Sequence, residues 1–326
     1  MKISNEESKD AAVVTRLNSW KYSCIMIAAE RIGLFDDLQE SKTVAEIAEL
    51  RGLSRESVQR LLYGLELTGL CYRDEDKWQL TGHGKRVVES PSQIRAQIRL
   101  AAVQMPQWLE LGRMGTTPSE WHKQGYKQAS KTWETLDFQQ VMQVNADAVA
   151  KVLQNANIPV TGTVVDVGGG MGDVLVRILN VYPKLTGVVL ELPEVAQLAE
   201  RWISATYPKS ITDRISVLSA NMFACDVHWE GDANLLVNIV HDWYDGAAAE
   251  LFRRCSETAP KLFVVERVVI PGREYLLAAH DLHMMAVTGG KQRTLQELTE
   301  LGKQAGFSVV SAQVSESTFS VVEFAR

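Results

Sequence analysis

Val164-Val-Asp-Val-Gly-Gly-Gly-Met-Gly-Asp173 is the stretch that decides the fold of this chain. Its β-branched run predicts a buried strand, and the four glycines that follow predict a tight turn into a helix. A helix that starts after such a turn presents unpaired backbone N–H groups to a ligand, and glycine lets the ligand come close to the backbone. The stretch therefore predicts a loop that holds an adenosine-bearing cofactor.

Strand and helix patterns alternate from Thr163 onward. Two final strands, near 308–314 and 318–325, follow each other directly and predict a hairpin that adds an antiparallel strand at one edge. This order predicts an α/β, Rossmann-like domain with a mostly parallel, seven-stranded sheet. The other expected strands are 163–168, 186–191, 215–219, 234–240 and 261–267, with helices near 172–182, 194–206, 245–258 and 294–305.

The N-terminal region has the pattern of a winged helix. Helices are expected at 43–50, where Thr43 and Glu46 have capping-box spacing, and at 54–67, with a hairpin over 71–80. Residues 1–100 carry 15 Lys and Arg and 15 Asp and Glu. Because a DNA-binding surface is normally basic, this balance favours a dimerisation or lid role, with a DNA-binding regulator as the alternative.

Length and composition narrow the class of protein. A chain of 326 residues with 46% hydrophobic residues predicts a globular protein of two domains. We divide it into a winged-helix region (1–92), a helical region (93–157) and a cofactor-binding region (158–326). The net charge of −6, the polar N-terminus and four scattered cysteines predict a cytoplasmic protein without nucleic-acid or membrane partners.

Polar side chains follow several consecutive strands, at the sheet edge where open α/β proteins bind ligands. Glu191 lies 19 residues after Gly172, a spacing suited to an acid that binds a ribose. Asn221-Met222 and His241-Asp-Trp243 follow the next two strands. A nicotinamide cofactor is the alternative, but the Gly-x-Gly-x-Gly spacing differs from the usual dinucleotide pattern.

These motifs together resemble the small-molecule O-methyltransferases that use S-adenosylmethionine, a group that spans plant phenolic and bacterial antibiotic-tailoring enzymes. The resemblance implies a class I methyltransferase domain, an N-terminal dimerisation domain that makes a homodimer, and a small-molecule acceptor. It also implies His241 as the catalytic base. By the same resemblance the cofactor-binding residues are Asp166, Gly168, Gly170, Gly172, Glu191, Leu192, Asn221, Met222, Asn238 and Trp243, and the acceptor-binding residues are Phe138, Met142, Asp281, His283 and Met284.

The resemblance specifies the cofactor more narrowly than the reaction. Many members have Glu where this chain has Gln292, which can donate a hydrogen bond to the base but supplies no charge; Glu323 matches a second family acid and is expected to compensate. Transfer to nitrogen or carbon, or an enzyme that retains the cofactor without methyl transfer, stays open. His280, Asp281 and His283 suggest a metal site, but their helical spacing argues against it, and no metal is expected.

Overall fold

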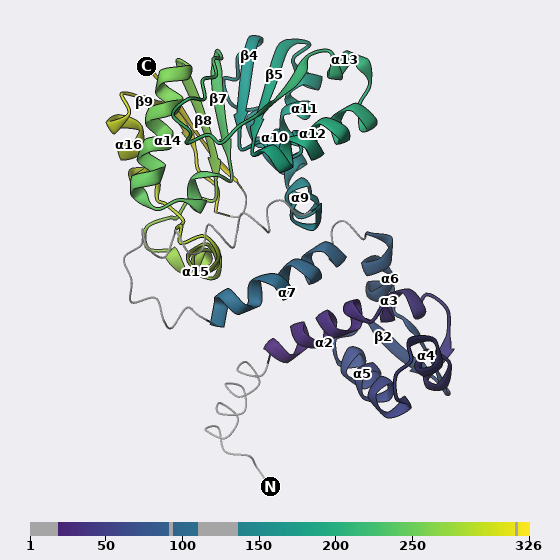
Figure 1. The fold of residues 1–326 in the computed structure, drawn as a ribbon. Helices are drawn as coiled ribbons and strands as arrows, with labels where there is room; N and C mark the ends of the chain where they lie inside the picture. Colours follow the sequence, from purple (N-terminus) through teal and green to yellow (C-terminus); the bar gives the residue numbers. More distant parts are fainter. Residues whose placement is uncertain (1–18, 91–93, 110–135, 317–318) are drawn as a thin grey trace. The chain divides into compact units, whose positions relative to one another are not determined.

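The computed structural model describes residues 19–90, 94–109, 136–316 and 319–326, and the chain forms two compact units, 1–105 and 106–326 (Figure 1). The expected helical region 93–157 lies partly outside the described residues. None of the described helices is both long enough and apolar enough to span a membrane. The N-terminal unit contains α2 (Trp20–Arg31), α3 (Leu34–Asp37), β1 (Lys42–Thr43), α4 (Val44–Arg51), α5 (Arg55–Leu67), β2 (Cys71–Asp74), β3 (Lys77–Leu80) and α6 (Gly82–Glu89), and α7 (Ala96–Leu109) runs across the boundary.

The N-terminal unit has the expected helix, turn, helix and hairpin. Thr43 and Glu46 form the predicted capping box at the start of α4, and the Ser54 hydroxyl accepts a hydrogen bond from the Ser57 N–H at the start of α5. The strands form a small sheet in the order β1-β3-β2. Trp78 of β3 is fully buried in a core with side chains from α3, α4 and α5, so the hairpin is anchored to the helices.

The second unit is an α/β domain. Its helices and strands alternate from β4 onward, as the sequence predicts. They are α9 (Leu136–Gln143), α10 (Ala146–Leu153), β4 (Thr161–Val167), α11 (Asp173–Val181), β5 (Lys184–Glu191), α12 (Pro193–Thr206), α13 (Lys209–Thr212), β6 (Ile215–Ser219), β7 (Ala233–Val237), α14 (Asp245–Thr258), β8 (Lys261–Glu266), α15 (Ala278–Val287), α16 (Leu295–Gln304), β9 (Ser308–Gln313) and β10 (Ser320–Ala325).

The sheet has seven strands in the order β6-β5-β4-β7-β8-β10-β9, which confirms the predicted mostly parallel sheet. The predicted position of the antiparallel strand at the edge of the sheet is wrong. β10 is the antiparallel strand, but it pairs with both β8 and β9 and therefore lies one strand in from the edge. β10 is almost wholly buried and β9 is mostly exposed, so the more apolar strand of the hairpin takes the interior position.

Two apolar clusters cover the two faces of this sheet. Along β8 the side chains alternate between them: Phe263 and Val265 belong to one cluster, and Leu262 and Val264 belong to the other. This alternation sends the side chain of Glu266, the last residue of β8, toward the face that holds Leu262 and Val264. The parallel strands β4 to β8 end at one edge, where the sequence places the polar residues that follow them.

Candidate functional site

The glycine loop after β4 has a shape that only glycine adopts easily. Gly168, Gly170 and Gly172 have φ angles of 76°, 57° and 79°. A Cβ on Gly168 would lie 2.5 Å from Cδ1 of Ile239, and one on Gly170 would lie 3.0 Å from Oε1 of Gln139. The loop thus passes close to two neighbouring segments before α11 begins, and larger residues would displace them.

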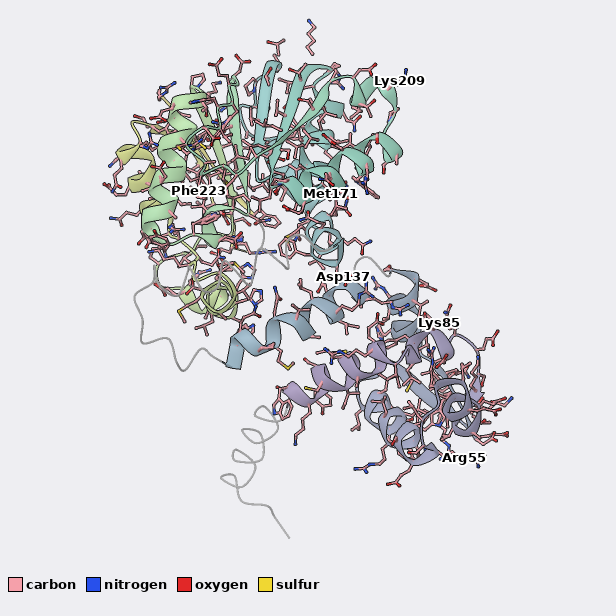
Figure 2. The ribbon with its side chains drawn as sticks, in the orientation of Figure 1. Arg55, Lys85, Asp137, Met171, Lys209 and Phe223 are labelled. Atoms are coloured by element: carbon pink, nitrogen blue, oxygen red, sulfur yellow. The ribbon has the colours of Figure 1, made fainter. Side chains whose placement is uncertain are left out.

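This loop forms one wall of a cleft at the carboxyl ends of the strands. The cleft encloses about 1090 Å³, including the part open to solvent. Met171 comes from the glycine loop, and Phe223 follows β6 (Figure 2). The ring of Phe223 packs against that of the cleft residue Trp243, with 4.5 Å between the ring centroids. Of the residues expected to bind cofactor, those that line the cleft are Asp166, Gly168, Gly170, Glu191, Leu192, Asn221, Met222, Asn238 and Trp243.

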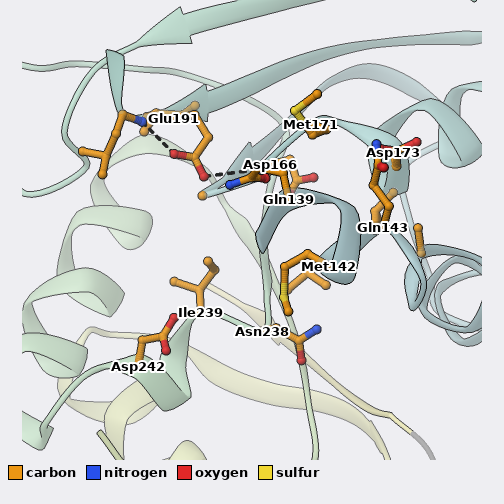
Figure 3. Close-up of a pocket in the computed structure, with 18 of the residues that line it drawn as sticks. Gln139, Met142, Gln143, Asp166, Met171, Asp173, Glu191, Asn238, Ile239 and Asp242 are labelled. Carbon is orange, nitrogen blue, oxygen red and sulfur yellow. Dashed lines mark hydrogen bonds between the residues drawn. The ribbon is translucent and has the colours of Figure 1, made fainter. Parts of the chain in front are cut away.

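Two carboxylates lie at the floor of the cleft. Glu191 accepts hydrogen bonds from the N–H groups of Gly170 at 3.2 Å and Leu192 at 2.7 Å (Figure 3). Asp166 is buried, and within the described residues its Oδ1 has no hydrogen-bond partner. Burial raises the pKa of Asp166 to about 7, helped by the nearby Glu191, and burial also raises the pKa of Glu191 to about 7. An unpaired carboxylate oxygen here suits a ligand that brings hydroxyl or ammonium donors.

Asn221 and Asn238 both line the cleft, but their side-chain oxygens differ in hydrogen bonding. The side-chain oxygen of Asn221 accepts a hydrogen bond from the Phe223 N–H at 2.9 Å, so this amide also closes its own turn. Asn238 adopts a φ of 55°, which is unusual for a residue other than glycine, and its Oδ1 is buried without a partner in the described part of the chain. Its strained backbone and unpaired oxygen are typical of a binding site.

Phe138 and Met142, which were expected on the acceptor side, line the same cleft from α9. Gln139 and Gln143 of the same helix also line it, and Gln143 donates to Oδ2 of Asp173 at 2.6 Å, which ties α9 to the start of α11. Helix α9 therefore covers the glycine loop directly.

His241 is held by an acid that the sequence reasoning missed. Its Nδ1 lies 2.6 Å from Oε2 of Glu266. Oε1 of Glu266 accepts hydrogen bonds from the backbone N–H groups of Val240 at 2.8 Å and His241 at 3.2 Å. Burial lowers the pKa of His241, but the carboxylates of Glu266 and Asp242 raise it by more, so its net shift is upward. Glu266 is the last residue of β8. Looking for polar side chains at the end of this strand, as at the ends of the earlier strands, would therefore have identified it.

Glu323 does not reach His241, contrary to the expectation that it compensates for Gln292. Its two carboxylate oxygens accept hydrogen bonds from the backbone N–H and the side-chain amide of Asn157, at 3.1 and 2.9 Å. The register explains this, because Ser320 lies opposite Glu266 and Glu323 lies opposite Phe263. Glu323 is thus three residues away from the end of the strand and faces the opposite side of the sheet.

Gln292 is buried next to His241 and Glu266, in a small cavity that all three line. Both polar atoms of its side chain lack a hydrogen-bond partner among the described residues. Its backbone N–H donates to Oδ1 of Asp281 at 2.7 Å, so Asp281 holds the loop that carries Gln292. Gln292 is therefore close to His241, but in the described part of the chain no hydrogen bond links the two side chains.

The remaining acceptor-side residues come from α15. Met284 is buried, and Nδ1 of His283 accepts a hydrogen bond from Nε1 of Trp108 at 3.1 Å. In the described part of the chain no three His, Cys, Asp or Glu side chains converge in a way that could hold a metal ion.

Known proteins that are similar to this chain are O-methyltransferases. The family model for the O-methyltransferase domain matches residues 115–308. A 2,7-dihydroxy-5-methyl-1-naphthoate 7-O-methyltransferase from Streptomyces carzinostaticus is 29% identical over 86% of this chain and 87% of its own. A phenazine O-methyltransferase from Lysobacter antibioticus is 32% identical, over 49% of this chain and 47% of its own length.

A solved structure is also similar over nearly the whole chain. It is an O-methyltransferase from neocarzinostatin biosynthesis in complex with S-adenosyl-L-homocysteine and 1,4-dihydroxy-2-naphthoic acid. Its TM-score is 0.75 at 27% identity, and the match covers 93% of this chain and 95% of that chain.

We predict that Gly170→Asp abolishes binding of S-adenosyl-L-homocysteine, with a loss of affinity of about 100-fold or more in calorimetry. The new carboxylate would lie beside Glu191, which accepts a hydrogen bond from the Gly170 N–H. Gly272→Asp is the matched control, because Gly272 also has a positive φ but has open space around it. Normal affinity in Gly170→Asp would show that the glycine loop does not bind the cofactor.

Proposed function

The chain belongs to the O-methyltransferase family and uses S-adenosylmethionine, and from this premise we propose that it methylates a hydroxyl of a small aromatic metabolite with His241 as the general base. The observation that supports this role is the pairing of His241 with Glu266 at the end of β8. The relatives named above act on, or are bound to, aromatic compounds, and we extend that substrate class to this chain.

The cleft residues fit the cofactor. Asp166 and Glu191 would accept hydrogen bonds from its hydroxyl or ammonium groups, because Asp166 has an unpaired buried oxygen and Glu191 lies beside it. Met222 and Trp243 would contact the adenine ring of the cofactor. The glycine loop would let the cofactor come close to the protein backbone. When bound, S-adenosylmethionine supplies an electrophilic methyl group on a sulfonium.

His241 would remove the acceptor's proton. The Glu266 carboxylate faces Nδ1, so Nδ1 carries the ring proton and Nε2 is left to accept a proton from the acceptor hydroxyl. Transfer from a phenol with a pKa of about 10 to an ordinary histidine with a pKa of about 6.5 is uphill by about 5 kcal/mol. Because Glu266 raises the pKa of His241, it reduces this gap. It also supplies the charge that Gln292 lacks.

We predict that His241→Ala lowers kcat by about 100-fold or more and leaves the affinity for S-adenosyl-L-homocysteine within about twofold of wild type. The reason is that His241 contributes a proton acceptor and does not line the cofactor cleft. Turnover and calorimetry on the same preparation provide the two values. Undiminished turnover would exclude His241 as the base.

The charge of Glu266 gives a pH prediction. The base works only when neutral, so activity falls as the pH drops below the pKa of His241. Glu266 raises that pKa, and Glu266→Gln keeps a hydrogen-bond acceptor but removes the charge. We therefore expect the acidic limb of the kcat/KM profile to move to lower pH and kcat to fall. Asp245→Asn, an acid outside the pair, is the control; an unmoved limb in Glu266→Gln would contradict the pairing.

The N-terminal unit is proposed to join two copies of the chain. Tyr63 and Leu67 lie one turn apart on α5, and they are 46% and 74% exposed. Large apolar side chains that are exposed next to each other are typical of a surface that binds another protein. We predict that Leu67→Lys shifts the full chain toward monomer in sedimentation equilibrium. Val160→Lys, at a residue 63% exposed in the second unit, should not, and equal behaviour of both variants would count against this interface.

A further inference from the structure

A second cavity lies at the same edge of the sheet as the cofactor cleft, next to the carboxyl end of β8. It encloses about 600 Å³, including the part open to solvent. One wall comes from the loop between β8 and α15, and the other comes from the connection between β9 and β10. The described residues that line this cavity and those that line the cofactor cleft are different. The function proposed above uses none of the residues in this second cavity.

The register of the sheet explains how Arg267 comes to line this cavity. Ser320 of β10 lies opposite Glu266 of β8, so Phe319 is the next residue in line opposite Arg267. The guanidinium of Arg267 lies over the ring of Phe319, with 5 Å or less between them: its Cζ is 4.5 Å from the ring centroid. Phe319 belongs to the apolar cluster that contains Val265, so Arg267 lies on the opposite side of the sheet from Glu266.

The positive charge of Arg267 has no ion-pair partner among the residues that the structure describes. Its neighbour Glu266 uses one carboxylate oxygen for the ring of His241 and the other for backbone N–H groups. The other two charged residues of the cavity, Arg273 and Glu316, form an ion pair with each other. Two arginines against one glutamate give the described lining one net positive charge.

Burial adds to the effect of this unmatched charge. Arg267 is partly buried, and burial lowers its pKa, although the charge of Glu266 opposes this shift. Stacking on Phe319 accounts for the position of the guanidinium, but it leaves the N–H groups of Arg267 without a hydrogen-bond acceptor among the described residues. An anion in the cavity would supply both an opposite charge and acceptors for these donors.

The rest of the cavity is largely aliphatic. Val268, Ile270, Leu276 and Leu277 line it, and Leu276 is 46% exposed. An inorganic anion would pair with Arg267 but would leave these side chains uncovered, whereas a neutral apolar molecule would leave the charge unmatched. One guanidinium beside an aliphatic wall is therefore suited to a carboxylate that is attached to a hydrocarbon group.

We propose that this cavity binds a small organic carboxylate. Arg267 would hold the carboxylate group, because a guanidinium presents parallel N–H donors that match its two oxygens. The aliphatic side chains would contact the hydrocarbon part of the ligand. The site is separate from the cofactor cleft and from His241, so the inference does not depend on the proposed function.

Calorimetry on the full chain with S-adenosyl-L-homocysteine present tests this site, with cyclohexanecarboxylate as the probe. Wild type should bind the probe, and it should bind the neutral cyclohexanecarboxamide about tenfold more weakly or worse. Inorganic phosphate should also bind more weakly, because it makes no contact with the aliphatic side chains. Arg267→Gln should weaken the affinity for cyclohexanecarboxylate by about tenfold or more. Arg201→Gln, at an exposed arginine of α12, is the matched control and should bind as wild type.

A second variant predicts a gain of affinity, which misfolding cannot imitate. Glu316→Gln removes a negative charge from the lining and releases Arg273 from its ion pair. The affinity for cyclohexanecarboxylate should therefore rise by about threefold or more, while that for cyclohexanecarboxamide should stay within about twofold.

Loss of affinity in Arg267→Gln together with a gain in Glu316→Gln supports the inference. Absence of binding in wild type would overturn it, as would equal affinities for the carboxylate and the amide. Phosphate that binds as tightly as cyclohexanecarboxylate would contradict the role of the aliphatic side chains. Unchanged affinity in Arg267→Gln would place the probe elsewhere, and an affinity that does not rise in Glu316→Gln would show that the charge of this cavity does not govern binding; either result overturns the site.

Discussion

Three carboxylates lie at the carboxyl ends of parallel strands, and the cost of removing them from water constrains the loops around them. Asp166 near the end of β4 and Glu266 at the end of β8 are buried, and Glu191 at the end of β5 is partly buried. A buried carboxylate is stable only when hydrogen bonds or opposite charge replace water. Backbone N–H groups from the loops meet Glu191 and Glu266, and this requirement fixes the path of both loops. Oδ1 of Asp166 has no hydrogen-bond partner among the residues that the structure describes, which suits a ligand with a donor group.

The glycine loop follows from the same requirement. Gly170 donates its N–H to Glu191 from a backbone conformation with a positive φ angle. A Cβ at this position would lie 3.0 Å from Oε1 of Gln139, so the loop also has little room for a side chain there. The imidazole of His241 is set in a similar way, since Glu266 binds both its ring and its backbone N–H. The glycine loop and His241 are thus held in the same way, by a carboxylate at a strand end that accepts hydrogen bonds from the neighbouring loop.

Local signals in the sequence were sufficient for most of the fold. The β-branched run before Gly168, the capping box at Thr43 and the alternation from Thr163 onward each act over a few residues, and the corresponding elements are present. Features set by long-range pairing were not predictable in this way. The place of β10 inside the sheet depends on its register with β8, and the same register keeps Glu323 away from His241. The link between Trp108 and His283 joins residues 175 positions apart, which no local pattern encodes.

The central claim is that the chain moves a methyl group to an acceptor oxygen with His241 as the base. The most direct measurement supplies S-adenosylmethionine labelled with carbon-13 in its methyl group, together with hydroxylated naphthoic acids, and follows the label by NMR. We predict a methyl signal on oxygen with one equivalent of S-adenosyl-L-homocysteine, present for wild type and lost in His241→Ala. Label on nitrogen or carbon, or undiminished O-methylation by His241→Ala, would contradict the account.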